Sequence, residues 1–187
     1  LKQCGKTMAD VTAVAVAEGP GSFTGVRIGV AAAKGFAWGG ELPCYGVSTL
    51  EAMARSLDAW NGYVVPTMDA RRDQTYTAVF KAENGKLSRV TEDAAISYAE
   101  LGEKLKNCDN PIFLVGDGAV LCYNMLQEKV AGLVLPSEHR IHQRAAGVAL
   151  VAYDMMEAGL PGDGNSLTPN YLRLSQAERE RLARENR

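Results

Sequence analysis

The stretch at residues 18–29 is the part of the chain whose residue types and spacing most favour chemistry. It carries four glycines and two hydroxyl side chains directly after an apolar segment. Backbone N–H groups at the start of a following helix, together with hydroxyls, can hold an anion such as a phosphate. The candidate contacts are Gly19, Gly21, Ser22 and Thr24. The spacing matches neither GxxxxGK(S/T) nor GxGxxG, so a tight strand-to-helix turn against a neighbouring surface is the simpler interpretation.

Charged side chains follow a predicted strand end at Asp69, Arg71 and Arg72. Because open α/β sheets gather ligand groups at strand ends, these residues are candidates for lining a cleft, although a structural ion pair fits equally well. Asp117 lies in a glycine turn, where an ordinary turn aspartate and a metal-facing one have the same signature. The chain offers no Ser–His–Asp or Cys–His arrangement, and we therefore expect it to contain no catalytic residue.

The histidines and cysteines give no metal signature. His139 and His142, the two histidines, form an HxxH spacing, whereas HExxH and HxxxH are absent, which favours a surface or interface pair over a metal site. The four cysteines make no CxxC pair, and we interpret them as reduced and buried. They are Cys4, Cys44, Cys108 and Cys122.

The segments on either side of the glycine stretch predict a strand and a helix. Residues 11–17 are apolar and β-branched, and residues 26–38 are rich in alanine and glycine. Gly29 and Gly35 each lower helix propensity by roughly 0.8–1 kcal/mol relative to alanine, which close packing would offset. The packed surface is either a partner chain or the protein's own sheet. The residues predicted to contact a partner are Gly25, Val26, Gly29, Val30, Ala33 and Phe36.

The remaining pattern alternates strands and helices, which indicates an α/β protein. Capping boxes are predicted at 48–51 and 97–100, and Asn84-Gly85 is a hairpin signal. The predicted strands after the glycine stretch are 43–47, 63–68, 74–81, 87–90, 112–115 and 132–135. The predicted helices are 48–57, 97–107, 119–128 and 141–157.

The order of these elements suggests a duplicated unit. The second half reads βββαβαβα, and the first half reads only αβαβα, as if a leading three-strand meander were absent. We expect a remainder of an N-terminal half at 1–61, a C-terminal half at 62–160 and a C-terminal extension at 161–187. The charge-rich end, 175–187, is interpreted as a solvated helix or frayed tail, with a partner-binding helix as the alternative.

Composition and net charge limit the classes of partner that this chain could bind by itself. It has 187 residues, of which 47% are hydrophobic and 22% charged, an ordinary globular composition. A formal net charge of -2 argues against strong binding of nucleic acid or an anionic membrane by this chain alone. No uncharged apolar run is long enough to cross a bilayer and no signal peptide is visible, so we expect a cytoplasmic protein.

Five motifs, in order, resemble the TsaB (YeaZ) family. They are GPGSFTGVRIG at 19–29, GVSTL at 46–50, DAR at 69–71, GDG at 116–118 and PNYLR at 169–173. The resemblance implies an actin-like (ASKHA) fold of two ribonuclease-H-like halves, in agreement with the inferred duplication. Relative to the family, a hairpin, a strand and most of a helix would precede Leu1. The strand at 11–17 would then keep an unpaired edge, to be filled by a native N-terminal part or by another chain.

The resemblance also implies an accessory role. In this family's pathway the paralogue TsaD, which carries HxxxH, transfers the threonylcarbamoyl group to adenosine in tRNA, and TsaB binds TsaD, with the ATPase TsaE joining them. We therefore expect a non-catalytic subunit that forms a homodimer without TsaD and meets tRNA only indirectly. No cofactor should be bound tightly, with ATP or ADP at the partner interface. The alternative is a stand-alone ASKHA-fold nucleotide-dependent enzyme or a glycoprotease-like peptidase.

Overall fold

The computed structural model describes residues 1–108 and 111–173, so the predicted tail at 175–187 lies outside the described part. The chain opens with two short 3₁₀ turns, Lys2–Cys4 and Met8–Asp10, and no residue of either turn is buried. Gly5 ends the first turn, with a left-handed φ of 65°.

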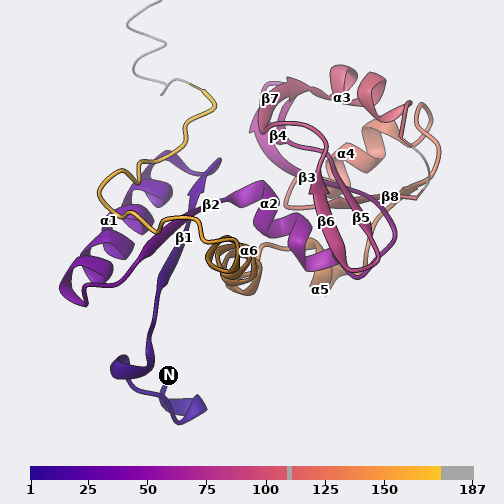
Figure 1. Ribbon diagram of the computed structural model, residues 1–187. Coiled ribbons are helices and arrows are strands. Elements are labelled where there is room, and N and C mark those ends of the chain that lie inside the picture. The colour runs from indigo at the N-terminus through magenta and orange to yellow at the C-terminus, as the bar shows by residue number, and fades with distance from the viewer. Residues whose placement is uncertain (109–110, 174–187) are drawn as a thin grey trace, which may run out of the picture.

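The N-terminal sheet has two parallel strands, β1 (Val14–Gly19) and β2 (Cys44–Ser48), joined through α1 (Phe23–Gly39). One face of this sheet packs on α1 through Val14 and Val16. The other face packs on α6 (Ala145–Glu157), which comes from the far end of the chain (Figure 1). Helices therefore cover β1 and β2 on both sides, as is usual for parallel strands.

The C-terminal sheet is built around β3, the longest strand. Its N-terminal part pairs with β5 and its C-terminal part with β4, both antiparallel, and the register with β4 shifts between Asp69 and Arg71. β6 pairs antiparallel with β5, and β7 pairs antiparallel with β4. β8 pairs parallel with β3, and β9 pairs parallel with β8. The bounds are β3 (Gly62–Arg71), β4 (Gln74–Thr77), β5 (Phe80–Glu83), β6 (Lys86–Arg89), β7 (Ala94–Ser97), β8 (Ile112–Val115) and β9 (Leu133–Val134).

The predicted strand 74–81 is split at Ala78 and Val79. The Val79 N–H donates to the Thr91 hydroxyl at 2.9 Å, and its carbonyl accepts from Val90 at 2.8 Å. These bonds replace the regular ladder at the break between β4 and β5. β7, which the sequence did not predict, pairs with β4. The predicted three-strand order and the Asn84-Gly85 hairpin are confirmed, both turn residues having positive φ.

The helices of this half are close to the predictions, with one exception. The capping box at Ser97 is present, because the Glu100 N–H donates to the Ser97 hydroxyl at 3.1 Å and the Ser97 N–H to the Glu100 carboxylate at 3.3 Å. The predicted helix 141–157 is broken because the Ile141 carbonyl accepts from the Gly116 N–H at 2.7 Å instead of continuing the helix. The bounds are α3 (Tyr98–Leu105), α4 (Ala119–Leu126), α5 (Glu138–Ile141) and α6 (Ala145–Glu157).

Two helices pack across the predicted boundary at 61/62. The short helix α2 (Thr49–Ala54) places Leu50 and Met53 in the core of the C-terminal sheet, beside Phe80. In return α6 packs on the N-terminal sheet, and a side chain at Gly147 would collide with the Ala52 carbonyl. The two halves are thus interlocked by exchanged helices, and the predicted division at 61/62 stays a prediction.

A strap at residues 160–173 follows α6 and returns across the N-terminal sheet to α1 (Figure 1). It contains no helix or strand within its described residues, yet Leu167 is only 7% exposed and belongs to the core between α1 and the sheet. The Cys44 N–H donates to the Gly162 carbonyl at 3.2 Å. The strap therefore begins as a packed part of the N-terminal layer.

A candidate cleft and docking helix

A cleft of about 470 Å³ lies between the N-terminus of α1 and the carboxyl end of β3. Polar groups enter it from both halves, and its third wall is the end of the strap. The sequence predicted ligand groups at strand ends, and the structure brings several of them together here. The residues that line the cleft include Gly21, Ser22, Phe23, Asp69, Arg71, Asp117, Tyr171 and Arg173.

The glycine stretch forms one wall of this cleft. β1 ends at Gly19, whose φ of 131° is accessible to glycine, and Ser22 caps α1 by accepting the Gly25 N–H at 3.4 Å. Gly21 and Ser22 line the cleft, whereas Gly19 is buried beneath the strap and Thr24 is not among the lining residues. The predicted anion contacts thus divide into two that face the cleft and two that do not, and anion binding stays a prediction.

The opposite wall carries the two predicted carboxylates, Asp69 and Asp117. The Asp69 carboxylate accepts the Arg71 backbone N–H at 2.7 Å, which orients the turn after β3. In that turn Arg71, Arg72 and Asp73 all have left-handed φ angles between 55° and 61°, an unfavourable conformation for residues other than glycine. Burial, with the charge of Asp69 next, raises the pKa of the nearby Tyr98 hydroxyl to about 12, so it stays neutral at ordinary pH.

An aromatic and cationic cluster stands at the mouth of the cleft, and the sequence did not single it out. Phe23 stacks on Tyr171 with ring centroids 4.3 Å apart. The Arg27 guanidinium lies 4.2 Å from the Phe23 ring centroid and donates from Nε to the Tyr171 hydroxyl at 2.7 Å. Tyr171 belonged to a recognised motif, but only the fold brings it to α1, because 144 positions separate it from Arg27.

One face of α1 is buried against the sheet, and the other is exposed. Four of the residues predicted to contact a partner lie toward the protein's own sheet: Val26, Gly29, Val30 and Ala33. Val30 and Ala33 are 3% and 7% exposed, so close packing on the sheet accounts for the small residues of this face. Gly25 and Phe36 are exposed. Partner contact through the six residues stays a prediction, and in this structure only the latter two are freely accessible.

The outer face of α1 carries large apolar side chains in solvent. Ile28 is 64% exposed, Phe36 is 65% exposed and Trp38 is 87% exposed. Ala31 and Ala32 lie between them and are exposed as well. Apolar surface gathered on one helix face in this way is typical of a protein contact, whereas single exposed apolar residues are common.

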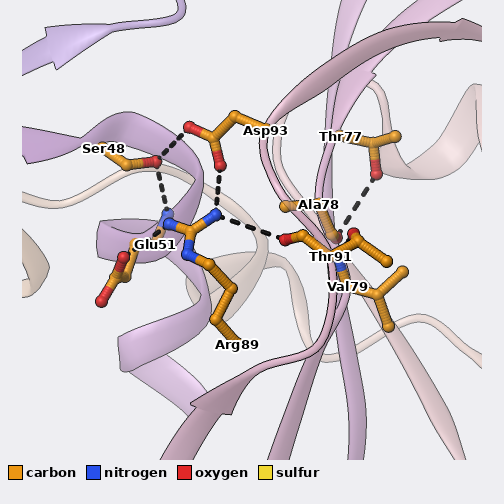
Figure 2. A network of polar contacts seen from close by, with 8 residues as sticks. All are labelled: Ser48, Glu51, Thr77, Ala78, Val79, Arg89, Thr91 and Asp93. Carbon is orange, nitrogen blue, oxygen red and sulfur yellow. Dashed lines mark hydrogen bonds and ion pairs between the residues drawn. The ribbon is translucent and has the colours of Figure 1, made fainter.

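A polar network joins α2 to the C-terminal sheet (Figure 2). Arg89 of β6 donates to the Asp93 carboxylate at 2.6 Å and to the Glu51 carboxylate at 2.5 Å, while Asp93 accepts the Ser48 hydroxyl at 2.6 Å. The capping box predicted at 48–51 is therefore only half formed. Ser48 caps the Glu51 N–H at 3.2 Å, but the Glu51 carboxylate pairs with Arg89 instead of returning to Ser48.

Burial and charge set the pKa values around this network. Burial alone would lower the pKa of Arg89, but its hydrogen bonds and charge contacts with Asp93 and Glu51 outweigh burial and raise it. The pKa of Glu18 is also raised, first by burial and then by the nearby charge of Asp93. Arg89 therefore stays charged, whereas Glu18 pays a desolvation cost when it ionises.

The remaining candidate groups lie outside the cleft. His139 and His142 are exposed, and none of the described residues gather three or more His, Cys, Asp or Glu side chains as a metal site would require. Cys44 and Cys122 are buried as expected, but Cys4 is exposed and Cys108 is half-buried. Within residues 1–108 and 111–173, every helix is too short or too polar to span a bilayer.

Comparison with known proteins places these features in a family. Residues 1–181 match the family model described as TsaD, tRNA N6-adenosine threonylcarbamoyltransferase. The chain is also 35% identical to the tRNA threonylcarbamoyladenosine biosynthesis protein TsaB of Bacillus subtilis, over 95% of this chain and 76% of that protein. The chain belongs to the TsaB family. The TsaB protein of Escherichia coli is 33% identical over 92% of this chain and 75% of its own length.

Solved structures carry the same fold. YeaZ from Pseudomonas aeruginosa superposes with a TM-score of 0.70 at 22% identity, covering 91% of this chain and 78% of that one. A crystal structure of a P. aeruginosa protein described as similar to peptidase YeaZ gives 0.72 at 24% identity, covering 92% and 79%. The actin-like α/β fold that the TsaB resemblance implied is thus confirmed, with the exchanged helices and the strap as its local details.

Proposed function

We propose that this chain is a non-catalytic subunit that binds a TsaD-type paralogue, with a TsaE-type ATPase, in forming threonylcarbamoyladenosine in tRNA. The observation that carries the proposal is the match to TsaB proteins over nearly the whole chain. The outer face of α1 supports it, since Ile28, Phe36 and Trp38 are large, apolar and exposed on one helix. Burial of such a surface drives most protein association.

The docking surface in this proposal is the outer face of α1, and it refines the set predicted from sequence. Gly25 and Phe36 remain in the set because they are exposed, whereas a larger residue at Ala33 would overpack the contact with the sheet. Substitution at Ala33 would therefore test folding and not docking. A homodimer in the absence of the paralogue would use the same outer face.

The test is the affinity of the chain for its TsaD-type paralogue, measured by isothermal titration calorimetry. An Ile28→Glu, Phe36→Glu variant should bind at least about tenfold more weakly, because two charges would be desolvated in an apolar contact. Val120→Glu is the matched control, since Val120 is 52% exposed on α4, away from α1. Equal affinity of the wild type and the double variant would contradict docking on this face.

The alternative, a stand-alone nucleotide-dependent enzyme or peptidase, draws support from the cleft with Asp69 and Asp117. ATP turnover or peptide cleavage by the purified chain, lost on Asp69→Asn, would favour it over an accessory role. The proposal expects neither activity. ATP or ADP at the junction with the paralogue, with Gly21 and Ser22 as the accessible groups of the glycine turn, stays a prediction that titration of the complex with nucleotide would test.

A further inference from the structure

The strap at residues 160–173 has a firmly packed first part. Lys34 of α1 donates to the carbonyl oxygens of Asn165 and Leu167 at 3.3 and 3.0 Å. A side chain at Gly46 would collide with Leu167, and one at Gly19 would collide with the Asn170 carbonyl. Two glycines of the N-terminal sheet thus leave room for the strap, and the Asn170 N–H donates to the Glu18 carbonyl at 2.7 Å. This part is built into the fold.

The last three residues of the strap, 171–173, differ from the first part because they cross the cleft. Tyr171 contacts one wall, stacking on Phe23 and accepting from Arg27 at the start of α1. Arg173 contacts the other wall, donating to the Ala70 carbonyl at the end of β3 at 2.6 Å. All three residues line the cleft. This segment therefore touches both halves of the molecule and crosses the space between them.

The contacts of this crossing lie at least partly in solvent, since the Arg27–Tyr171 hydrogen bond is exposed and the Arg173–Ala70 bond is only partly buried. Tyr171 is 37% exposed, so its stack and its hydrogen bond compete with water, unlike the buried Leu167 behind it. Exposed hydrogen bonds with few apolar contacts open at lower free energy than the core, without global unfolding. The exchanged helices α2 and α6 hold the halves together independently, so opening the crossing does not require the halves to separate.

We propose that residues 171–173 form a latch that closes the cleft and opens locally, with Tyr171 and Arg173 as its two contacts. Residues up to 170 stay seated on the N-terminal sheet while the latch moves. Closed, the latch shields the floor of the cleft, where Met68 is 9% exposed. Open, it exposes that floor and the N-terminal turn of α1. The proposal concerns the free chain and does not depend on the proposed accessory function.

The experiment compares the wild type with Tyr171→Ala in two measurements. Hydrogen exchange of the backbone amides at 171–173, followed by mass spectrometry, reports the latch itself. Thiol labelling of a Met68→Cys variant, resolved by peptide mass, reports access to the floor of the cleft. Loss of the stack, the cation–π contact and the hydrogen bond should accelerate both by about tenfold. Tyr153→Ala is the matched control, because Tyr153 is an exposed tyrosine on α6.

Two further variants keep the result interpretable. Tyr171→Phe retains the ring and removes the hydroxyl, and Arg173→Gln removes the contact with Ala70; each should give a smaller acceleration than Tyr171→Ala. Exchange in β8 reports global stability and should stay unchanged. Unchanged labelling of Cys at position 68 in Tyr171→Ala would overturn the latch, as would acceleration of the same size in the Tyr153→Ala control.

Discussion

Two units of this protein share one local plan and end in different environments. In the first unit, β1 leads through the glycine turn at 19–21 into α1 and then to the parallel strand β2. In the second unit, β8 leads through the turn Gly116-Asp117-Gly118 into α4 and then to the parallel strand β9. β8 pairs on both edges, with β3 and β9, and is buried throughout. β1 pairs with β2 alone among the described strands, and most of it is half-buried.

The difference shows that burial of a strand depends on its neighbours more than on its own sequence. Val14 and Val16 are as apolar as the residues of β8, and both strands have a helix on at least one face. What β8 has in addition is β3 on its second edge, which supplies both hydrogen bonds and apolar contact. The edge of β1 that faces away from β2 lies beside an apolar groove formed with α6. Stability should therefore be concentrated in the second unit.

The largest effect should come from truncating the core of the second unit. Leu114 of β8 is fully buried, so Leu114→Ala should lower the free energy of unfolding by about 3 kcal/mol. Val16→Ala in β1 should cost about 1 kcal/mol, because its side chain is only half-buried. Urea denaturation followed by circular dichroism measures both. Equal losses would break the comparison, since they would show that β1 is as tightly packed as β8.

The next largest difference in stability should appear between alanine substitutions in the two glycine turns. Gly116 has a φ of 100°, and a side chain there would collide with the Thr67 carbonyl in β3, so Gly116→Ala should destabilise by about 2 kcal/mol. Gly19→Ala meets the Asn170 carbonyl in the strap, and the local shift that this forces weakens the hydrogen bond from the Asn170 N–H to the Glu18 carbonyl. Its expected loss is about 1 kcal/mol, with faster hydrogen exchange of the Asn170 amide. Comparable exchange at Asn170 in both variants would contradict this assignment.

The polar network should have an intermediate effect, because it ties α2 to the second half. Arg89→Met leaves the Asp93 and Glu51 carboxylates without their cation and should cost about 1–2 kcal/mol. Lys86→Met, an exposed residue on the same strand, is the control and should change little. A double-mutant cycle with Glu51→Gln should give a coupling energy above about 0.5 kcal/mol, and additive losses would show that the pair does not interact.

The smallest effect should be a pH-dependent one at Glu18, the residue before the first glycine turn. Because its pKa is raised in the folded state, ionisation of Glu18 weakens folding at neutral pH. The cost vanishes as the pH falls below the pKa of an unfolded glutamate, since both states are then protonated. Glu18→Gln should thus raise the melting temperature slightly at pH 7 and lose that advantage near pH 4. If the gain in melting temperature of Glu18→Gln became larger as the pH falls, the predicted direction of the pH dependence would be wrong.

Local rules in the sequence predicted much of this. The Asn84-Gly85 hairpin, the Ser97 capping box and the strand-to-helix turn at 19–25 depend on residues a few positions apart, and all are present. The half-formed box at Ser48 marks the limit. Its Glu51 had the right spacing, but Arg89, 38 positions away, takes its carboxylate. A stronger, charge-assisted partner from a distant strand overrides a local hydrogen bond.

The candidate site was likewise predictable from the sequence only in part. Gly21, Ser22, Asp69 and Asp117 were recognisable because turns and strand ends use characteristic residues, and the fold assembles them at one cleft. Phe23, Arg27 and Tyr171 were not recognised as a cluster, since nothing near Tyr171 in the sequence indicates which helix it will meet. The inner and outer faces of α1 were likewise ambiguous, because small apolar residues suit a sheet and a partner equally.

The sequence by itself determined the α/β class, the duplicated order of elements and membership of the TsaB family, because each is written in short motifs and in hydrophobic periodicity. The tertiary structure decided which residues of α1 are accessible, how α2 and α6 exchange between the halves, and where the strap closes the cleft. These depend on contacts between residues of different elements, in some cases far apart in the sequence, such as Arg173 with Ala70, 103 positions away. Local propensity carries no information about such contacts, and only the packed fold specifies them.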